Sequence, residues 1–420
     1  MTEKKVLQGY AYAKEVFGEL GVDVDAAIAV ADQVPISMHC WQGDDLIGYD
    51  GVGELTGGIA ATGNYPGRAR NAEELKADID EALKNIPGKT KLSLHASYAE
   101  LNGKKIDRDS YTPELFDLWL QWAKERGMGL DMNPTFFSHP KMDGNFTLAS
   151  LDKGVRDFWI EHGKRCREIA EYWGKELGQV SINNFWMPDG FKDVPSDTYT
   201  HRKLMEESLD EIFSEKKDPK YMLDAVESKL FGFGIESHTV VSHEFAMGYA
   251  ISRKKLWTMD AGHFHPTESV ADKVSTSMLF LDGILLHISR PVRWDSDHVP
   301  TLNDDLQAIM NEIVRGGFLN RAHIAQDYFD ASINRIACWV IAMRNTRKAL
   351  LKACLEPVKA AVEAQEAGDF TSRLSLLEEN KSLPYSAIWD YYCMSRNVPV
   401  GRQWLQDVKR YETDVLFKRI

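Results

Sequence analysis

The sequence predicts an α/β fold, a (β/α)8 TIM barrel with a helical C-terminal extension, from three observations. Short apolar segments recur along the chain, longer amphipathic segments separate them, and metal-ligand residue types follow the later apolar segments. Strands that alternate with helices are typical of parallel βαβ units. Eight such units close a barrel whose functional face lies at the carboxyl ends of the strands. An open doubly wound sheet is the alternative, but no glycine-rich dinucleotide loop supports it.

The eight predicted strands are short apolar runs, and the segments between them are long enough for helices. In chain order the strands are residues 35–41, 92–98, 129–134, 179–186, 222–228, 255–260, 284–289 and 322–328. The clearest helical segments between them are residues 72–84, 113–126, 152–177, 269–281 and 303–316. From about Ile333 the chain is helix-rich and longer than one closing helix requires. We therefore expect a catalytic barrel domain over residues 1–332, and a helical extension over residues 333–420 that packs on the barrel or on a neighbouring subunit.

The composition indicates a folded chain with a large core, in one large α/β domain or two smaller ones, and argues against some partners. The chain has 420 residues, 44% of them apolar, which is enough for a large core. A net charge of −13 argues against nucleic acid or an anionic membrane as the main partner. The N-terminus has no apolar signal segment, and no apolar run approaches the roughly 18 residues of a membrane span. The five cysteines are scattered without a zinc or disulfide pattern, so we expect a reduced cytoplasmic compartment.

Metal-ligand residue types cluster after successive predicted strands. The candidates are Glu227 at the fifth strand, Asp260, His263 and His265 at the sixth, His287, Asp295, Asp297 and His298 at the seventh, and Asp327 and Asp330 at the eighth. In a barrel these neighbouring strand ends converge on one pocket. Carboxylates that lie close together repel each other and need compensating charge. Mixed carboxylate and imidazole ligands suit a six-coordinate divalent ion such as Mn²⁺, Mg²⁺ or Co²⁺.

The candidates are too many for one ion, so the sequence predicts two sites. One would use Glu227, Asp260, His287 and Asp327, and the other His263, Asp295 and Asp297. A lone aspartate after a strand is more often a helix N-cap, and that reading stays open for Asp330. A lone histidine inside an apolar strand, such as His287, would more often be a hydrogen-bonded core residue. The repetition of the pattern after successive strands favours metal binding over either explanation.

Several other residues would face the same pocket, and each has a structural alternative. His95, Asn133 and Lys229 lie on or just after predicted strands; Lys229 shares a strand face with Glu227 by period-two alternation. Four aromatic residues lie at strand ends, namely Trp41, Phe136, Phe137 and Trp186. We expect them either to form an apolar wall of the pocket or to pack in the core. The glycine-rich residues 57–67 lack the Lys-Ser/Thr of a phosphate loop, and we expect a mobile active-site loop there.

At these residues the chain resembles the L-rhamnose isomerase family. The resemblance covers essentially the whole chain, and its most specific segments are residues 38–45, 56–67, 224–232, 260–268, 289–299 and 327–337. It implies a (β/α)8 barrel, a homotetramer, and two divalent ions per subunit, Mn²⁺ or a similar ion such as Co²⁺, Mg²⁺ or Zn²⁺. Carried over by motif, a structural ion would bind Glu227, Asp260, His287 and Asp327, and a catalytic ion would bind His263, Asp295 and Asp297. Asp330 is the alternative to Asp327.

The resemblance also implies an aldose–ketose isomerase that interconverts L-rhamnose and L-rhamnulose. Divalent ions that polarise the sugar carbonyl favour a direct hydride shift between C2 and C1. An enediol route through a general base is the alternative. We expect catalytic roles for His95 in ring opening and for Lys229 at a substrate oxygen, and we also count Asp327 among the catalytic residues. A metal-dependent hydrolase or sugar-phosphate epimerase, and a non-enzymatic sugar-binding protein, are the other classes.

Overall fold

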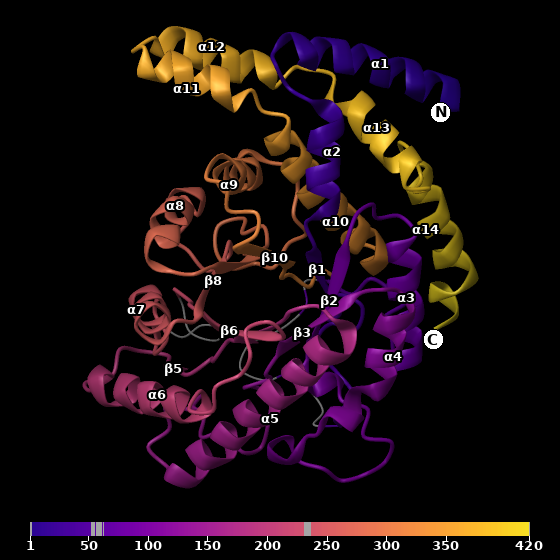
Figure 1. Cartoon of the computed structure of the whole chain (residues 1–420). Coiled ribbons are helices and arrows are strands. Elements are labelled where there is room, and N and C mark those ends of the chain that lie inside the picture. The colour runs from indigo at the N-terminus through magenta and orange to yellow at the C-terminus, as the bar shows by residue number, and fades with distance from the viewer. Residues whose placement is uncertain (1, 52–54, 56–60, 62, 231–236, 420) are drawn as a thin grey trace.

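The computed structural model describes residues 2–51, 55, 61, 63–230 and 237–419. Within these residues, eight parallel strands close into a barrel in the order β1-β10-β9-β8-β6-β4-β3-β2 (Figure 1). The strands are β1 (Ile36–His39), β2 (Thr90–His95), β3 (Gly129–Asn133), β4 (Ser181–Phe185), β6 (Met222–Glu227), β8 (Leu256–Asp260), β9 (Ile284–Ile288) and β10 (Ala322–Gln326). Each falls inside one of the eight predicted segments or within two residues of it. The predicted (β/α)8 barrel is therefore confirmed.

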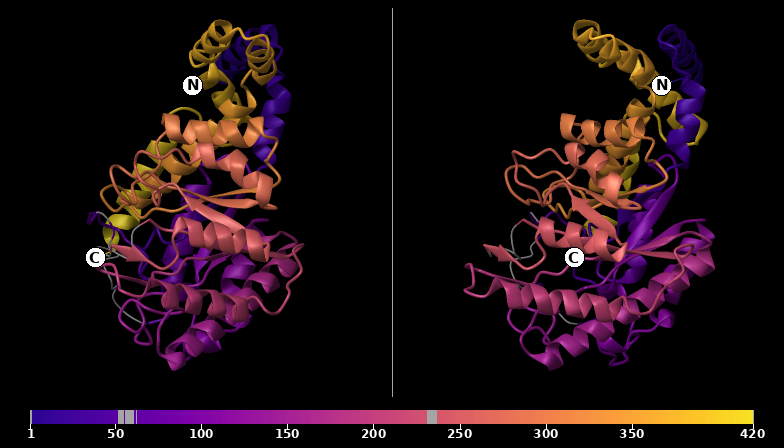
Figure 2. Two further views of the ribbon diagram at one scale, coloured as in Figure 1. Left: turned by 90° about the vertical axis from the view of Figure 1, so that its left-hand side faces the viewer. Right: turned by 60° about the vertical axis from the view of Figure 1, so that its left-hand side comes forward.

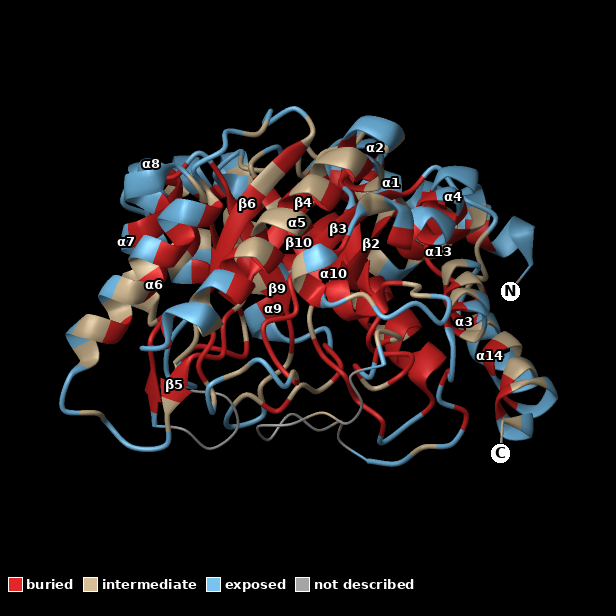
Figure 3. Ribbon diagram, turned by 90° about the horizontal axis from the view of Figure 1, so that it is seen from below, coloured by how far each residue is buried: buried red, intermediate tan, exposed pale blue. Residues whose placement is uncertain are grey.

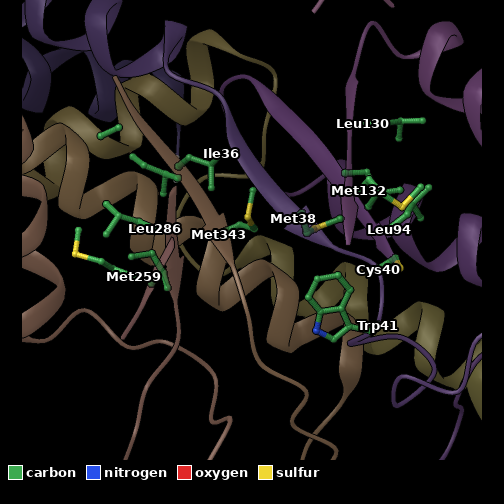
Figure 4. Close-up of a cluster of buried hydrophobic side chains, with 14 of the residues drawn as sticks. Ile36, Met38, Cys40, Trp41, Leu94, Leu130, Met132, Met259, Leu286 and Met343 are labelled. Carbon is green, nitrogen blue, oxygen red and sulfur yellow. The ribbon is translucent and has the colours of Figure 1, made fainter. Parts of the chain in front are cut away.

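The strands are buried on both faces, as parallel strands enclosed by helices must be. Residues alternate between the barrel interior and the layer beneath the helices. A small cluster of inward side chains from β4, β6, β8, β9 and β10 lies inside the barrel, consisting of Ile182, Ala225, Leu256, Leu285 and Ala325. Outward side chains join the main core: Ile36 and Met38 of β1 lie in one cluster with Met343 of a covering helix (Figure 4). The barrel interior thus contains both an apolar cluster and buried polar side chains that hydrogen-bond across it.

Helices surround the barrel, and their outer faces are exposed while the strands are buried (Figure 3). The helices are α1 (Glu3–Glu19), α2 (Val24–Gln33), α3 (Ala72–Leu83), α4 (Asp117–Glu125), α5 (Lys153–Leu177), α6 (Thr198–Ile212), α7 (His243–Arg253), α8 (Ala271–Phe280), α9 (Asp304–Arg315), α10 (Arg335–Cys354), α11 (Val358–Glu366), α12 (Phe370–Asn380), α13 (Tyr385–Ser395) and α14 (Gln403–Asp414). The predicted ends of the longest barrel helix are explained by its caps. The Asp152 side chain accepts hydrogen bonds from the first turn of α5, and Gly178 ends the helix at φ 63°.

The helices that follow β10 divide into two groups. Helix α10 packs against α9, α2, α3 and β1, as the helix that completes the eighth βα unit. Helices α11 and α12 pair with each other and, together with α1 and α13, project from the barrel (Figures 1 and 2). Helix α14 returns along α3 and α10. The N-terminal helix α1 packs on α13, so the beginning of the chain lies beside its C-terminal helical part. The predicted division at residue 332 stays a prediction.

Two sequence expectations concern segments outside the barrel strands. Among the described helices, none combines the length and apolarity that a membrane crossing needs. The predicted mobile loop over residues 57–67 includes residues 57–60 and 62, which lie outside the described residues. A two-stranded antiparallel ladder, β5 (Gly190–Phe191) with β7 (His238–Thr239), adds to the loops at the carboxyl end of the barrel.

Candidate metal centre

Four ligand-type side chains meet at the carboxyl ends of adjacent strands. Glu227, Asp260 and His287 lie at or near the ends of β6, β8 and β9, and Asp327 directly follows β10. The Nδ1 atom of His287 lies 3.1 Å from Asp327 Oδ2, 3.4 Å from Glu227 Oε2 and 3.7 Å from Asp260 Oδ2. One ligand atom from each residue lies within 4.8 Å of all the others. The strand register therefore brings the first predicted ligand group into one place.

A second group lies beside the first and shares Asp260 with it. Ligand atoms of Asp260, His263 and Asp295 lie within 4.8 Å of one another, and His263 Nε2 is 3.3 Å from Asp295 Oδ2. His263 Nδ1 lies 2.9 Å from the carbonyl oxygen of Ser228, which can only accept a hydrogen bond. Nδ1 therefore carries a proton, and Nε2 faces Asp295, where it would be available to a divalent ion. The sequence did not predict that Asp260 would belong to both groups.

Asp297 lies near both groups but, among the described residues, is a member of neither. Its backbone has φ 48°, in the left-handed region that aspartate tolerates better than most residues. Such conformations are concentrated at functional sites. Burial and the carboxylates of Asp295 and Asp327 raise the pKa of Asp297 well above its usual range. The carboxyl group of Asp297 is therefore close enough to the two groups for the negative charge of their carboxylates to act on it.

The electrostatics of the cluster fit a divalent cation. Burial raises the pKa of Asp260 to about 7, and neighbouring carboxylates add to this. Burial would lower the pKa of His287, but Glu227 and Asp327 raise it well above its usual value. Three buried atoms, Glu227 Oε1, His287 Nδ1 and Asp295 Oδ1, make no hydrogen bond of acceptable geometry with any described residue. Buried polar atoms without partners are costly, and oxygen and nitrogen ligands in this number suit a divalent ion.

The other ligand candidates predicted from the sequence make hydrogen bonds outside the two ligand groups. Asp330 Oδ1 accepts hydrogen bonds from the backbone nitrogen and the hydroxyl of Ser332, at 2.9 and 2.5 Å, so Asp330 stabilises a turn and Asp327 faces the cluster. His265 is exposed, and its Nδ1 pairs with the hydroxyl of Thr267. His298 Nδ1 pairs with Ser296 Oγ at 2.9 Å. Proximity in sequence to a strand end is therefore insufficient to place these side chains in the cluster.

Lys229 and His95 both lie in the pocket. Lys229 Nζ donates to Asp295 Oδ2 at 2.8 Å and lies 5.1 Å from the centroid of the Trp186 ring. Burial lowers the pKa of His95 to about 3, with help from the positive charge of Arg108, so its ring is neutral at physiological pH. His95 Nδ1 lies 3.3 Å from the hydroxyl of Thr135. The structure thus offers one cationic donor and one neutral imidazole beside the ligand groups.

Three of the four predicted aromatic residues line the pocket. The Trp41 ring packs edge-on to His95 at a centroid distance of 4.6 Å, and its Nε1 donates to Asp327 Oδ1 at 3.1 Å. Phe137 contacts Trp186 at 5.6 Å and His95 at 5.4 Å. Phe136 instead packs in the main core, for example against Trp159 at 5.7 Å. An apolar wall therefore adjoins the ligand groups, and Phe136 is a core residue.

Known proteins match almost the whole length of the chain. The model of a family described as L-rhamnose isomerase (RhaA) matches residues 4–419. The chain belongs to the L-rhamnose isomerase family. The L-rhamnose isomerase of Mannheimia succiniciproducens is 56% identical over 416 residues, which cover 99% of both chains. Those of Listeria monocytogenes serotype 4a and Salmonella agona are 55% and 53% identical over 418 and 413 residues, covering 99% and 98% of both chains. A solved L-ribulose 3-epimerase covers 78% of this chain and 96% of its own at 12% identity, with a TM-score of 0.49.

This member of the L-rhamnose isomerase family also uses neutral polar residues that the sequence did not single out. His243, at the start of α7, pairs through Nδ1 with Ser228 Oγ at 2.7 Å and through Nε2 with the carbonyl oxygen of His263 at 3.0 Å. It therefore ties the chain that follows β6 to the chain that follows β8. Asn184 and Thr258 lie beneath Glu227 and Asp260 on the inward faces of β4 and β8. Period-two alternation from the ligands would have indicated Thr258, because it precedes Asp260 by two residues.

Proposed function

We propose that this protein is a metal-dependent aldose–ketose isomerase that interconverts L-rhamnose and L-rhamnulose. The observation that carries this proposal is a buried cluster of carboxylates and imidazoles in a chain whose relatives, matched over their whole length, are L-rhamnose isomerases. The barrel places that cluster at the carboxyl ends of its strands, where barrel enzymes have their active sites.

We propose two divalent ions, with Mn²⁺ as the first choice and Co²⁺, Mg²⁺ or Zn²⁺ as alternatives. The residues that would hold the first are Glu227, Asp260, His287 and Asp327, and those that would hold the second are His263, Asp295 and Asp297. The shared position of Asp260 supports two neighbouring ions, because one carboxylate can serve both. When bound, such ions polarise sugar oxygens and lower the pKa of a water molecule.

The side chains around the ligand groups would bind and orient the sugar. Lys229 would donate a hydrogen bond to a sugar oxygen, and the neutral ring of His95 would move a proton during ring opening. Trp41, Phe137 and Trp186 would exclude water and contact the methyl group of a 6-deoxy sugar. Burial of one methyl group contributes only about 1 kcal/mol, so related aldoses should react as well. Hydrogen would pass directly from C2 to C1, because the pocket carboxylates are already gathered in the two ligand groups.

The proposal is tested by a chelation and reconstitution assay. The purified protein is treated with chelator, its metal content is measured, Mn²⁺ is restored, and L-rhamnose is added. We expect L-rhamnulose only after Mn²⁺ is restored. Failure to form any ketose with restored Mn²⁺, Co²⁺, Mg²⁺ or Zn²⁺ would overturn the proposed activity, and formation of an epimeric aldose would point to an epimerase.

We further propose a homotetramer located in the cytoplasm. Helices α11 and α12 expose apolar side chains, including Val362, Phe370 and Leu374, which supports burial against another subunit. All five cysteines lie among the described residues and are free, which supports a reducing compartment. Light scattering after size exclusion gives the mass of the assembly, and a mass other than four chains would contradict the tetramer.

A further inference from the structure

A line of buried hydrogen bonds crosses the barrel interior and ends on Glu227. Asn133 Nδ2 donates to Ser93 Oγ at 2.7 Å, and Asn184 Nδ2 donates to Asn133 Oδ1 at 3.2 Å. The same Asn184 nitrogen donates to Glu227 Oε2 at 2.6 Å. The side chains come from β2, β3, β4 and β6, four neighbouring strands, and all four residues are buried. The line therefore runs across one side of the barrel, directly beneath the first ligand group.

The orientation of the Asn184 amide follows from its partners. Ionised Glu227 only accepts hydrogen bonds, so the Asn184 nitrogen must face it. The Asn184 oxygen accepts from the hydroxyl of Thr258 at 2.7 Å. Both hydrogens of the nitrogen are then used, one by Glu227 and one by Asn133, and the amide has no freedom to flip without losing bonds. A hydrogen bond to a carboxylate is also stronger than one between neutral groups.

This bond assigns different surroundings to the two oxygens of Glu227. Oε2, which receives the Asn184 hydrogen, lies 3.4 Å from His287 Nδ1 in the first ligand group. Oε1 lies 3.1 Å from His263 Nδ1, beside the second group, and makes no hydrogen bond with the described residues. Among the described side chains, Asn184 makes the one hydrogen bond of good geometry to this carboxylate, while His263 and His287 approach it only at ion-pair distances. Residues that hydrogen-bond metal ligands orient them and tune the affinity for the ion.

We propose that Asn184 is a positioning residue that holds the carboxylate of Glu227 in the orientation needed to bind the ion of the first group. This inference rests on the proposed function, because it requires an ion at Glu227. Asn184 acts through Glu227 and not on the sugar. Its loss therefore weakens metal binding and lowers turnover at limiting metal, whereas KM for the sugar at saturating metal stays near the wild-type value.

The chain offers a matched control on the same strand. Asn183 is the same residue type, is also fully buried, and lies on the opposite face of β4, where its amide makes no hydrogen bond with the described residues. Metal-free wild type, Asn184→Ala and Asn183→Ala are titrated with Mn²⁺ by calorimetry, and melting is followed with and without Mn²⁺. We expect the tighter Mn²⁺ site of Asn184→Ala to weaken by about 10- to 100-fold. Asn183→Ala should keep the wild-type affinity.

A second pair of variants separates positioning from general support of the fold. Asn184→Asp keeps the size and the acceptor for Thr258 but loses the donor, so it should weaken Mn²⁺ binding as Asn184→Ala does. In a Glu227→Gln background, Asn184→Ala should cause little further loss, because the carboxylate it positions is absent.

The outcomes distinguish this inference from the proposed function. Equal Mn²⁺ affinity of wild type and Asn184→Ala overturns the inference, as does a full additional loss in the Glu227→Gln background. Failure of both Asn184 variants to fold assigns the residue to barrel stability and also overturns it. A wild-type protein that binds no divalent ion overturns the proposed function itself, and the inference with it.

Discussion

The two ends of the barrel interior both hold buried carboxylates, but they balance them differently. At the amino end, Asp131 of β3 pairs with Lys91 of β2 and accepts hydrogen bonds from Ser37 Oγ and the Ile182 nitrogen, each at 2.7 Å. Lys91 also donates to a backbone carbonyl oxygen. At the carboxyl end, Glu227 Oε1 and Asp295 Oδ1 make no hydrogen bond with the described residues, and carboxylates outnumber the neighbouring lysine.

This difference distinguishes a carboxylate that stabilises the fold from carboxylates that are available to a ligand. A buried carboxylate with a lysine, a hydroxyl and a backbone donor is compensated within the chain. A cluster with unused ligand atoms and excess negative charge lacks such full compensation among the described residues, and a divalent cation would provide it. The amino end should therefore govern stability without metal, and the carboxyl end should govern metal dependence and turnover.

The largest effect is expected from metal removal, which acts on the carboxyl end alone. Chelation should abolish turnover and lower the melting temperature, because an ion that binds only the native state stabilises it by about 4 kcal/mol at 1,000 times its Kd. Calorimetry with and without restored Mn²⁺ measures the shift. Full activity in a preparation shown by elemental analysis to be metal-free would contradict the two-metal site.

At the amino end, Lys91→Met should destabilise the protein by about 3–5 kcal/mol, because it leaves Asp131 buried without its cationic partner. Chemical denaturation of the metal-free protein measures this loss. Lys89→Met is the matched control: Lys89 is exposed, lies two residues away, and should change stability by no more than about 0.5 kcal/mol. The Mn²⁺ affinity of Lys91→Met should equal that of wild type; a weaker affinity would mean that the two ends are coupled.

A smaller effect is expected from removal of one charge at the carboxyl end. Asp297→Asn keeps the size of the side chain, and turnover should fall by about 10²-fold, as for loss of one electrostatic catalytic group. The melting temperature of the metal-free protein should not fall, because burial and neighbouring carboxylates already oppose the charge of Asp297. Asp282→Asn, at an exposed carboxylate, is the control for the substitution itself. Wild-type turnover in Asp297→Asn would contradict the proposed role of Asp297 as a ligand of the second ion.

The sequence predicted the barrel because each strand depends mostly on local composition. An apolar run such as that of β9, buried on both faces, is recognisable without knowledge of its neighbours. The two N-terminal helices were not predicted, because α1 has only one apolar face and is stabilised by packing on α13, far away in the sequence. Asp327 and Asp330 were distinguished only by three-dimensional contacts, with His287 and Ser332 respectively.

The candidate site was predictable where charged residues follow strands, and less so where neutral residues support them. Glu227, Asp260 and His287 carry an obvious chemical signal at strand ends. Asn184 and His243 carry none, because an asparagine in a strand and a histidine at a helix start have many structural roles. Their importance follows from distances across neighbouring strands and loops, which a single sequence does not contain.

The last prediction concerns the fate of the transferred hydrogen and carries the smallest expected signal. In a hydride shift the hydrogen passes directly from C2 to C1 and never resides on a group that exchanges with water. In an enediol route a general base holds the hydrogen, which can then exchange. The pocket offers few free bases, since its carboxylates are gathered in two ligand groups and Lys229 is paired with Asp295. Isomerisation of L-rhamnose in D₂O should therefore introduce very little deuterium at C1 of the ketose.

Base-catalysed isomerisation without enzyme in D₂O is the positive control for detection by NMR. Near-stoichiometric deuterium in the enzymatic product would reject the hydride shift and make Lys229 and His95 the first candidates for the base.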